Sequence, residues 1–224
     1  MDVRDKLGLL NEKIKKACDA SGRNPEDITV VAVTKYVSNE RAQEALEAGL
    51  NHLGENRDEG LDSKWEYLKD KPVWHFIGSL QSRKVKNIID KVTYIHSLDR
   101  HSLAKEIDKR AEKPVSCFVQ VNISGEESKQ GLPPQEVGSF IEGLSQYENI
   151  KVAGLMTMMP NIDDEAELRG YFRKMKHLQT EIAEMNLKHA PCQELSMGMS
   201  NDFMIAIEEG ATFIRVGTAL VGED

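Results

Sequence analysis

A lysine near the end of a hydrophobic strand is the clearest candidate for chemistry in this chain. Lys35 lies in the apolar, β-branched run Ile28–Tyr36, which follows the turn-forming segment 24–27 and predicts a buried parallel strand. Ligands bind at the carboxyl ends of such strands, and a lysine held against an apolar core has its charged form disfavoured. Its amine can then form a Schiff base with an aldehyde. Taken alone, the strand favours a solvent-exposed lysine without a chemical role.

Polar residues directly after the last two predicted strands have the composition of an anion site. Glycines there permit close backbone approach, hydroxyls offer hydrogen bonds, and Asn201-Asp202 opens a helix whose N-terminal amides attract phosphate. Barrels commonly hold phosphate after strands seven and eight. An aldehyde-reactive lysine facing such a site indicates pyridoxal 5'-phosphate (PLP) as the ligand. The residues of this predicted site are Ser196, Gly198, Ser200, Gly217 and Thr218.

The elements that must position these residues alternate along the chain between strand and helix. Eight strands alternating with helices in one chain of this size predict an α/β fold, a single (β/α)8 TIM barrel with an additional N-terminal helix. A doubly wound sheet is the structural alternative. After the first run, the predicted strands are 51–54, 73–78, 92–97, 115–123, 152–158, 194–197 and 213–216, and the predicted helices are 7–20, 38–48, 61–68, 82–90, 102–110, 134–144, 165–185 and 202–209.

Composition limits the classes of protein to which the chain can belong. Its 224 residues are 40% hydrophobic and 29% charged, which fits one domain of the size of a single α/β barrel. We therefore expect the PLP-binding barrel to form a single domain over residues 1–224. The net charge of -8 argues against nucleic acid or an anionic membrane as the main partner. The first 20 residues carry too many charges for a signal peptide or a membrane span, so we expect a cytoplasmic protein. The cysteines lie far apart without a CxxC motif, which predicts free thiols and no metal site.

Six motifs, in order along nearly the whole chain, resemble the pyridoxal phosphate homeostasis protein family. The resemblance implies a fold type III barrel similar to the N-terminal domain of alanine racemase, with the cofactor held on Lys35 as a Schiff base. One departure is Arg83, which stands where the family more often has asparagine and leaves the role of that position open. The motifs are Thr34-Lys35-Tyr36, Gly54-Glu55-Asn56, Trp74-His75-Phe76-Ile77-Gly78, Gly154-Leu155-Met156-Thr157-Met158, Leu195-Ser196-Met197-Gly198-Met199-Ser200 and Ile214-Arg215-Val216-Gly217-Thr218.

The resemblance also implies roles for individual residues. Asn56 would lie near the hydroxyl of the cofactor ring, and Arg215 near the pyridine nitrogen. Met156 would touch the cofactor because of where its motif lies, whereas His75 is at least as well explained as a hydrogen-bonded core histidine. The remaining implied contacts are to the phosphate, from Ser200, Gly217 and Thr218, with Ser196 and the amides of Met197 and Gly198 close by.

These roles favour a carrier of PLP over an enzyme, and no catalytic residue is predicted. Arginine stays protonated, so Arg215 would oppose protonation of the pyridine ring and weaken the cofactor as an electron sink. A racemase needs a second acid-base group, which in alanine racemase comes from a C-terminal domain and the partner subunit, and here the sequence ends at Gly222-Glu223-Asp224. We therefore expect a protein of PLP (vitamin B6) and amino-acid homeostasis that stores, buffers or delivers PLP without turnover of its own, with apo PLP-dependent enzymes as candidate recipients. The alternatives are an amino-acid racemase and a phosphate-binding regulatory barrel without Lys35 chemistry.

Overall fold

The eight predicted strands form a closed parallel barrel in which each strand pairs with the next and the first pairs with the eighth. The fold is that of a computed structural model, which describes residues 2–222. Residues Glu223 and Asp224, on which the expected absence of a further domain partly depended, lie outside the described residues. The strands are β1 Thr29–Val33, β2 His52–Glu55, β3 Val73–Phe76, β4 Tyr94–Leu98, β5 Val115–Gln120, β6 Ile150–Met156, β7 Glu194–Met199 and β8 Phe213–Val216.

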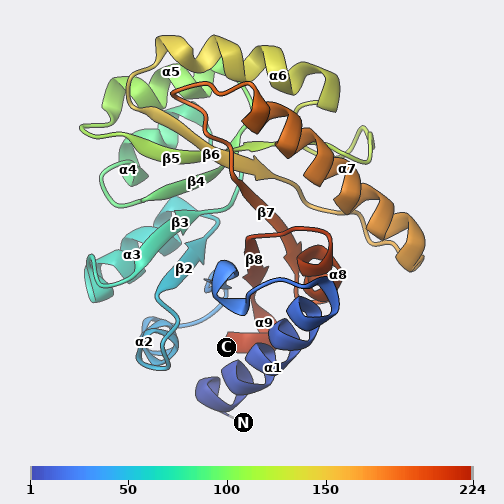
Figure 1. The fold of residues 1–224 in the computed structure, drawn as a ribbon. Helices are drawn as coiled ribbons and strands as arrows, with labels where there is room; N and C mark the ends of the chain where they lie inside the picture. Colours follow the sequence, from blue (N-terminus) through green and yellow to red (C-terminus); the bar gives the residue numbers. More distant parts are fainter. Residues whose placement is uncertain (1, 223–224) are drawn as a thin grey trace.

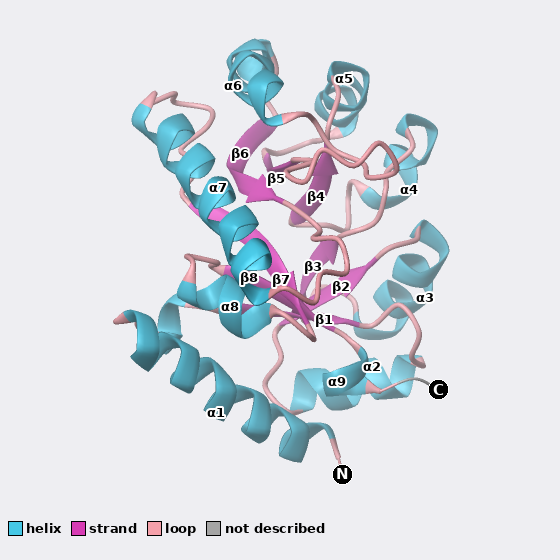
Figure 2. Ribbon diagram, turned by 90° about the vertical axis from the view of Figure 1, so that its right-hand side faces the viewer, coloured by secondary structure: helices cyan, strands magenta, loops and turns pink. Residues whose placement is uncertain are grey.

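Helices surround this barrel on its outside, as the (β/α)8 prediction requires (Figures 1 and 2). Several begin at capping side chains that the sequence places there, such as Ser38, whose hydroxyl accepts a hydrogen bond from the Arg41 amide. The α-helices are α1 Val3–Ser21, α2 Asn39–Glu47, α3 Asp58–Leu68, α4 Val85–Ile88, α5 His101–Arg110, α6 Pro134–Gly143, α7 Glu165–Glu184, α8 Phe203–Glu208 and α9 Thr218–Val221. Short 3-10 turns cover Pro25–Asp27, Ser82–Lys84 and Leu144–Gln146.

Most element boundaries shift by a few residues from the predicted ones, and three differences bear on the site or on the element count. β1 ends at Val33, so Lys35 lies in the turn after the strand instead of in it. The helix predicted over 82–90 is a 3-10 turn followed by the four-residue α4. The helix α9 was not predicted, because Thr218–Val221 is too short to show a helical period in sequence.

The N-terminal helix α1 closes the outside of the barrel against its last elements. It packs against α8 and α9, so the two ends of the described chain lie on the same side of the molecule (Figure 1). Leu10, Ile14 and Ala17 form its buried face. At its end, Arg23 donates hydrogen bonds to the carbonyls of Ile207 and Ala211, each at 2.7 Å. The additional helix therefore supports the β7–β8 region, where the predicted anion site lies.

Two further expectations concern cysteines and membranes. Cys18, Cys117 and Cys192 are buried free thiols, as predicted. Burial raises the pKa of Cys117 and of Cys192 to about 12, which makes both weak nucleophiles at neutral pH. Within residues 2–222, no helix has the length and apolar character needed to cross a membrane.

Candidate functional site

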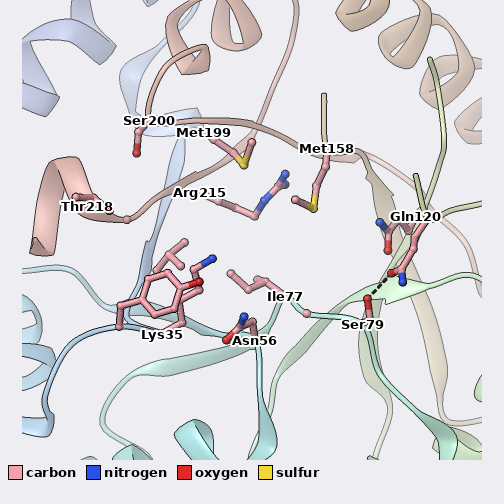
Figure 3. A pocket seen from close by; sticks show the side chains of 15 residues that line it. Lys35, Asn56, Ile77, Ser79, Gln120, Met158, Met199, Ser200, Arg215 and Thr218 are labelled. Atoms are coloured by element: carbon pink, nitrogen blue, oxygen red, sulfur yellow. Dashed lines mark hydrogen bonds between the residues drawn. The ribbon is translucent and has the colours of Figure 1, made fainter. Parts of the chain in front are cut away.

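A cavity of about 410 Å³ opens at the carboxyl ends of the strands, and it contains six of the predicted site residues. Its volume falls in the range of small-molecule sites. Figure 3 shows Ser200 and Thr218 on one side of the cavity and Ser79 and Gln120 on the other, with Lys35 and Arg215 between them. The residues that line it are Val33, Lys35, Tyr36, Asn56, Ile77, Gly78, Ser79, Gln120, Gln130, Met158, Met199, Ser200, Arg215, Gly217 and Thr218.

Lys35 reaches this cavity from the turn between β1 and α2. The turn is fixed by backbone hydrogen bonds on either side of the lysine, from the Val37 amide to the Thr34 carbonyl and from the Thr34 amide to the Gly54 carbonyl. The Lys35 Nζ lies 4.5 Å from the centroid of the Tyr36 ring. Lys35 itself is exposed. The expectation that an apolar core would desolvate this amine is therefore wrong, because the strand ends two residues before it.

A buried carboxylate anchors the residue that precedes the lysine. Thr34 Oγ1 donates a hydrogen bond of 2.6 Å to Glu55 Oε1, and Lys64 Nζ lies 3.1 Å from the same oxygen. Burial raises the pKa of Glu55, and the charge of Lys64 acts against that rise. Gly60 leaves the space for this carboxylate, because a Cβ there would lie 2.7 Å from Glu55 Oε2. The base of the Lys35 turn is thus held by an ion pair inside the protein.

Asn56 lines the cavity beside Lys35, at the end of β2. The chain after β3 approaches it so closely that only glycine fits at position 78. A Cβ on Gly78 would lie 2.2 Å from the Asn56 carbonyl oxygen. This contact joins the ends of β2 and β3 and fixes the backbone that carries Asn56.

The predicted anion site is a loop surface formed by the ends of β7 and β8. The register between these strands shifts between Ser196 and Met199, and Gly198 lies there with a φ of +93°. Asp202 Oδ1 accepts a hydrogen bond of 2.5 Å from the Met199 amide, which holds the loop that carries Ser200. Burial raises the pKa of Asp202. Ser200, Gly217 and Thr218 all line the cavity, as predicted.

Arg215 lies at the floor of the cavity on β8 and is buried. Its Nη1 donates a hydrogen bond of 2.5 Å to Ser196 Oγ, and its Nη2 donates one of 2.8 Å to the Thr157 carbonyl. Burial lowers the pKa of Arg215 to about 10, and the negative charge of Asp202 opposes this shift. At neutral pH, Arg215 is therefore a fixed, protonated cation.

The wall opposite the anion site was not predicted as part of it. Ser79 donates a hydrogen bond to Gln130 Oε1, which ties the loop after β5 to the loop after β3. Gln120, at the end of β5, and Met158, after β6, complete this wall. Ser79 and Met158 lie at the ends of predicted strands. Gln130 lies in a loop, and no pattern in the sequence indicates that this loop reaches the cavity.

Five predicted site residues lie outside the cavity lining. Gly198 forms the loop bend described above, and Met197 lies in the core beneath it. Met156 packs inside the barrel. Ser196 faces Arg215 instead of the cavity, and His75 is buried in the barrel with its two ring nitrogens 2.9 Å from neighbouring histidines. These side chains lie beneath the cavity and support its lining. The sequence had left two interpretations of His75 open, and the structure matches the one of a hydrogen-bonded core histidine.

Comparison with known proteins identifies the family. A profile described as "Alanine racemase, N-terminal domain" matches residues 5–224. The pyridoxal phosphate homeostasis protein of Aquifex aeolicus is 42% identical over 227 residues, an alignment that covers 100% of this chain and 99% of that protein. The chain belongs to the pyridoxal phosphate homeostasis protein family. The predicted resemblance is therefore confirmed.

Solved structures extend this family relationship to the fold. PipY of Synechococcus elongatus PCC7942, in a structure with PLP bound, is 30% identical, with a TM-score of 0.85 and coverage of 99% of this chain and 100% of PipY. An alanine racemase of Clostridium difficile 630 has a TM-score of 0.77 at 17% identity and covers 98% of this chain but 56% of the racemase. The homeostasis family therefore shares its barrel with part of a larger enzyme.

Proposed function

We propose that this chain binds PLP in the cavity at the carboxyl ends of the strands and acts as a carrier that stores and delivers it. The observation that carries the proposal is a single cavity of about 410 Å³ that combines a primary amine, a loop surface with two hydroxyl side chains and a buried cation. The names of its relatives and the PLP bound to PipY support the same ligand.

The residues present fit the chemical groups of this cofactor. The Lys35 amine and the cofactor's aldehyde would condense to a Schiff base with release of one water molecule, which leaves the cofactor attached to the chain. Ser200, Gly217 and Thr218 would hold the phosphate, which is the strongest anionic group of the ligand. Asn56 would bind the ring hydroxyl, and Arg215 would lie beside the pyridine nitrogen.

Arg215 is also the reason to favour a carrier over an enzyme. When bound to an enzyme, PLP supplies an electron sink, and this chemistry is strongest when the pyridine nitrogen is protonated. A protonated guanidinium beside that nitrogen disfavours its protonation. Because burial and two hydrogen bonds fix Arg215 in place, its charge stays at the floor of the cavity. The exposed position of Lys35 is consistent with release of the cofactor to another protein.

Transfer of the cofactor tests the proposal directly. Purified protein loaded with PLP is mixed with an apo PLP-dependent enzyme, and the recovered activity of that enzyme is followed. We expect the recipient to be activated by the loaded wild-type chain. PLP-treated Lys35→Ala protein, freed of unbound cofactor, should activate it much less because it retains less cofactor.

A chiral assay distinguishes this function from that of a racemase. Loaded protein is incubated with a panel of D- and L-amino acids, with Lys35→Ala as the control. The carrier proposal predicts no sustained change in chirality. Lysine-dependent racemisation with steady turnover would contradict the carrier role and establish the racemase alternative, whereas failure to bind PLP at all would contradict both.

A further inference from the structure

A continuous chain of buried hydrogen bonds leads from Arg215 through the inside of the barrel. Arg215 donates to Ser196 Oγ at 2.5 Å, and Ser196 Oγ lies 2.8 Å from His96 Nδ1. His96 Nε2 lies 2.9 Å from His75 Nδ1, and His75 Nε2 lies 2.9 Å from His52 Nδ1. The five side chains come from β8, β7, β4, β3 and β2.

The arginine determines the direction in which every hydrogen bond of the chain points. A guanidinium can only donate, so Ser196 Oγ must accept from Arg215 and its hydroxyl hydrogen remains available for His96 Nδ1. His96 then carries its proton on Nε2 and donates to His75 Nδ1, and His75 in turn donates from Nε2 to His52. The opposite direction would leave the Ser196 hydroxyl hydrogen, in a fully buried residue, without an acceptor in this chain of contacts.

Aromatic stacking and burial keep the inner two rings neutral and in one orientation. His75 stacks on Tyr94 with 4.6 Å between ring centroids, and His96 stacks on Phe118 with 4.4 Å. Burial lowers the pKa of both histidines well below the ordinary value. Two neutral rings with their lone pairs directed toward the guanidinium partly compensate a buried positive charge without adding a negative one.

The far end of the chain opens at the opposite mouth of the barrel. His52, the first residue of β2, is half-buried and lines a cavity of about 280 Å³ whose other residues carry no charge. Around its ring, α1 and β1 contribute uncharged residues to this cavity, and β8 contributes Phe213. The titratable groups in ring contact on this side are His75 from β3 and, behind His75, Tyr94 from β4. Burial and the negative charge of Glu194, the first residue of β7, raise the pKa of Tyr94. His52 is therefore the member of the chain at which a proton can be exchanged with solvent.

We propose that His52, His75 and His96 are positioning residues for Arg215, forming a directional relay that couples its hydrogen bonding to protonation at the opposite mouth of the barrel. With His52 neutral, His96 and His75 accept on Nδ1 and donate from Nε2, and His52 accepts on Nδ1 while its own proton is on Nε2. Protonated His52 has a hydrogen on both nitrogens and can no longer accept from His75. To keep the chain bonded, His75 and His96 must move their protons to Nδ1, and His96 then donates to Ser196.

The consequence of this reversal appears at the cavity floor. Ser196 Oγ would then accept from Arg215 and from His96 at once, and its own hydroxyl hydrogen would lose its acceptor. Protonation of His52 thus weakens the support of Arg215 without any group entering the PLP cavity. The relay consists only of the protein's own side chains and needs no bound ligand. It therefore goes beyond the proposed function and does not depend on it.

Nitrogen NMR of the ring atoms tests the relay in the full-length protein without added PLP. With ¹⁵N-labelled histidine, the spectrum distinguishes a protonated ring nitrogen from a bare one. At neutral pH we expect His52, His75 and His96 each to carry the proton on Nε2. On acidification, His52 should become charged with a midpoint below the ordinary histidine value, while His75 and His96 move their protons to Nδ1 with the same midpoint. Repeating the titration with added PLP shows separately whether cofactor binding alters it.

Two variants make the test specific. His52→Gln retains an acceptor for His75 but takes up no proton, so His75 and His96 should keep their neutral-pH tautomers on acidification. His101 is exposed and does not belong to the hydrogen-bonded series from Arg215 to His52, so His101→Gln should leave the coupled shift unchanged. A proton on Nδ1 of His75 or His96 at neutral pH, or titration of His52 without a change in the other two rings, would overturn the proposal. Failure of PLP binding would contradict the proposed function and not the relay.

Discussion

The two cations that line the cavity, Lys35 and Arg215, lie in opposite physical environments. Lys35 is in a turn, exposed, with its amine over the Tyr36 ring. Arg215 is in a strand, buried, and donates hydrogen bonds to Ser196 and Thr157. The two positions are nevertheless close in the fold, because β1 and β8 pair along their lengths.

This difference shows how one end of the barrel can supply both an accessible amine and a fixed positive charge. An amine that condenses with an aldehyde arriving from solution must be reachable from solvent, and the exposed turn leaves Lys35 accessible. A charge that tunes a bound ring must stay in one place, which requires burial and fixed hydrogen bonds. We therefore expect Lys35 to matter for ligand attachment and Arg215 to matter for both stability and ligand binding.

Replacement of Lys35 should have the largest effect on the ligand and almost none on the fold. Lys35→Ala should abolish the visible absorbance of covalently held PLP, while its free energy of unfolding stays within about 0.5 kcal/mol of wild type, as is usual for exposed positions. Absorbance spectra and urea denaturation measure the two quantities. Lys86→Ala, at another exposed lysine, is the matched control and should change neither. Retained covalent absorbance in Lys35→Ala would contradict the assignment.

Replacement of Arg215 should affect both quantities. The two hydrogen bonds that it donates are worth about 3–6 kcal/mol together. Removing the guanidinium also removes the free-energy cost of burying a charge, which offsets part of that loss. For Arg215→Ala we therefore expect a net decrease of about 2–4 kcal/mol in the free energy of unfolding. PLP should also bind more weakly. Urea denaturation with wild-type stability would show that the buried guanidinium does not support the fold.

Acid should destabilise the barrel interior that supports Arg215. Burial lowers the pKa of His75 and His96 in the folded protein. Below about pH 6.5 the unfolded chain takes up protons that these folded histidines do not, so stability falls as pH falls, by about 1 kcal/mol for each residue between pH 6.5 and 5.5 and by about 1.4 kcal/mol per pH unit further below. The two together predict a loss of about 2 kcal/mol between pH 6.5 and 5.5.

Urea denaturation between pH 6.5 and 5.5 measures this slope. His75→Gln should reduce it by about one histidine's contribution, whereas His101→Gln, at an exposed residue, should not. If the slope is the same in the His75 variant and in wild type, the buried histidine is protonated in the folded state and the interior is not as described.

Substitutions in the anion-binding loops should have the smallest effects. Loss of one charge-assisted hydrogen bond costs about 1.5–3 kcal/mol, so Ser200→Ala or Thr218→Val should weaken PLP binding roughly ten- to hundred-fold. Equilibrium dialysis measures this, with Ser139→Ala on α6 as the control. Pyridoxal, which lacks the phosphate, should bind poorly to wild type and lose little in the two variants. Equal retention of pyridoxal and PLP by wild type would place the phosphate elsewhere.

The barrel was predictable from sequence because its strands carry a local signal. The valine-rich run of β1 predicts a strand by itself, and the segment 213–216 follows from the regular alternation of strands and helices. The strand boundary next to Lys35 was not predictable, because Thr34 continues the β-branched run but bonds to Glu55 across the turn. That two-residue difference decided whether Lys35 is buried or exposed.

The site was predictable where it follows strand ends and not where it depends on distant contacts. Ser200, Gly217 and Thr218 reach the cavity because the ends of β7 and β8 must lie near β1 in a closed barrel. Gln130 reaches it from a loop through its contact with Ser79, which no local pattern indicates. Ser196 and His75 were predicted as site residues, but their hydrogen bonds to each other's neighbours inside the barrel were not predicted. The members of this hydrogen-bonded chain lie on five strands, and their contacts have no sequence signature.

The central claim is that PLP is held on Lys35, and reductive trapping measures this most directly. Wild-type protein is loaded with PLP, reduced with borohydride to fix any Schiff base, digested and mapped by mass spectrometry. We predict that the cofactor is attached predominantly to Lys35, and that the other exposed lysines carry only minor label at a saturating but low PLP concentration. Predominant attachment to any other lysine would contradict the account.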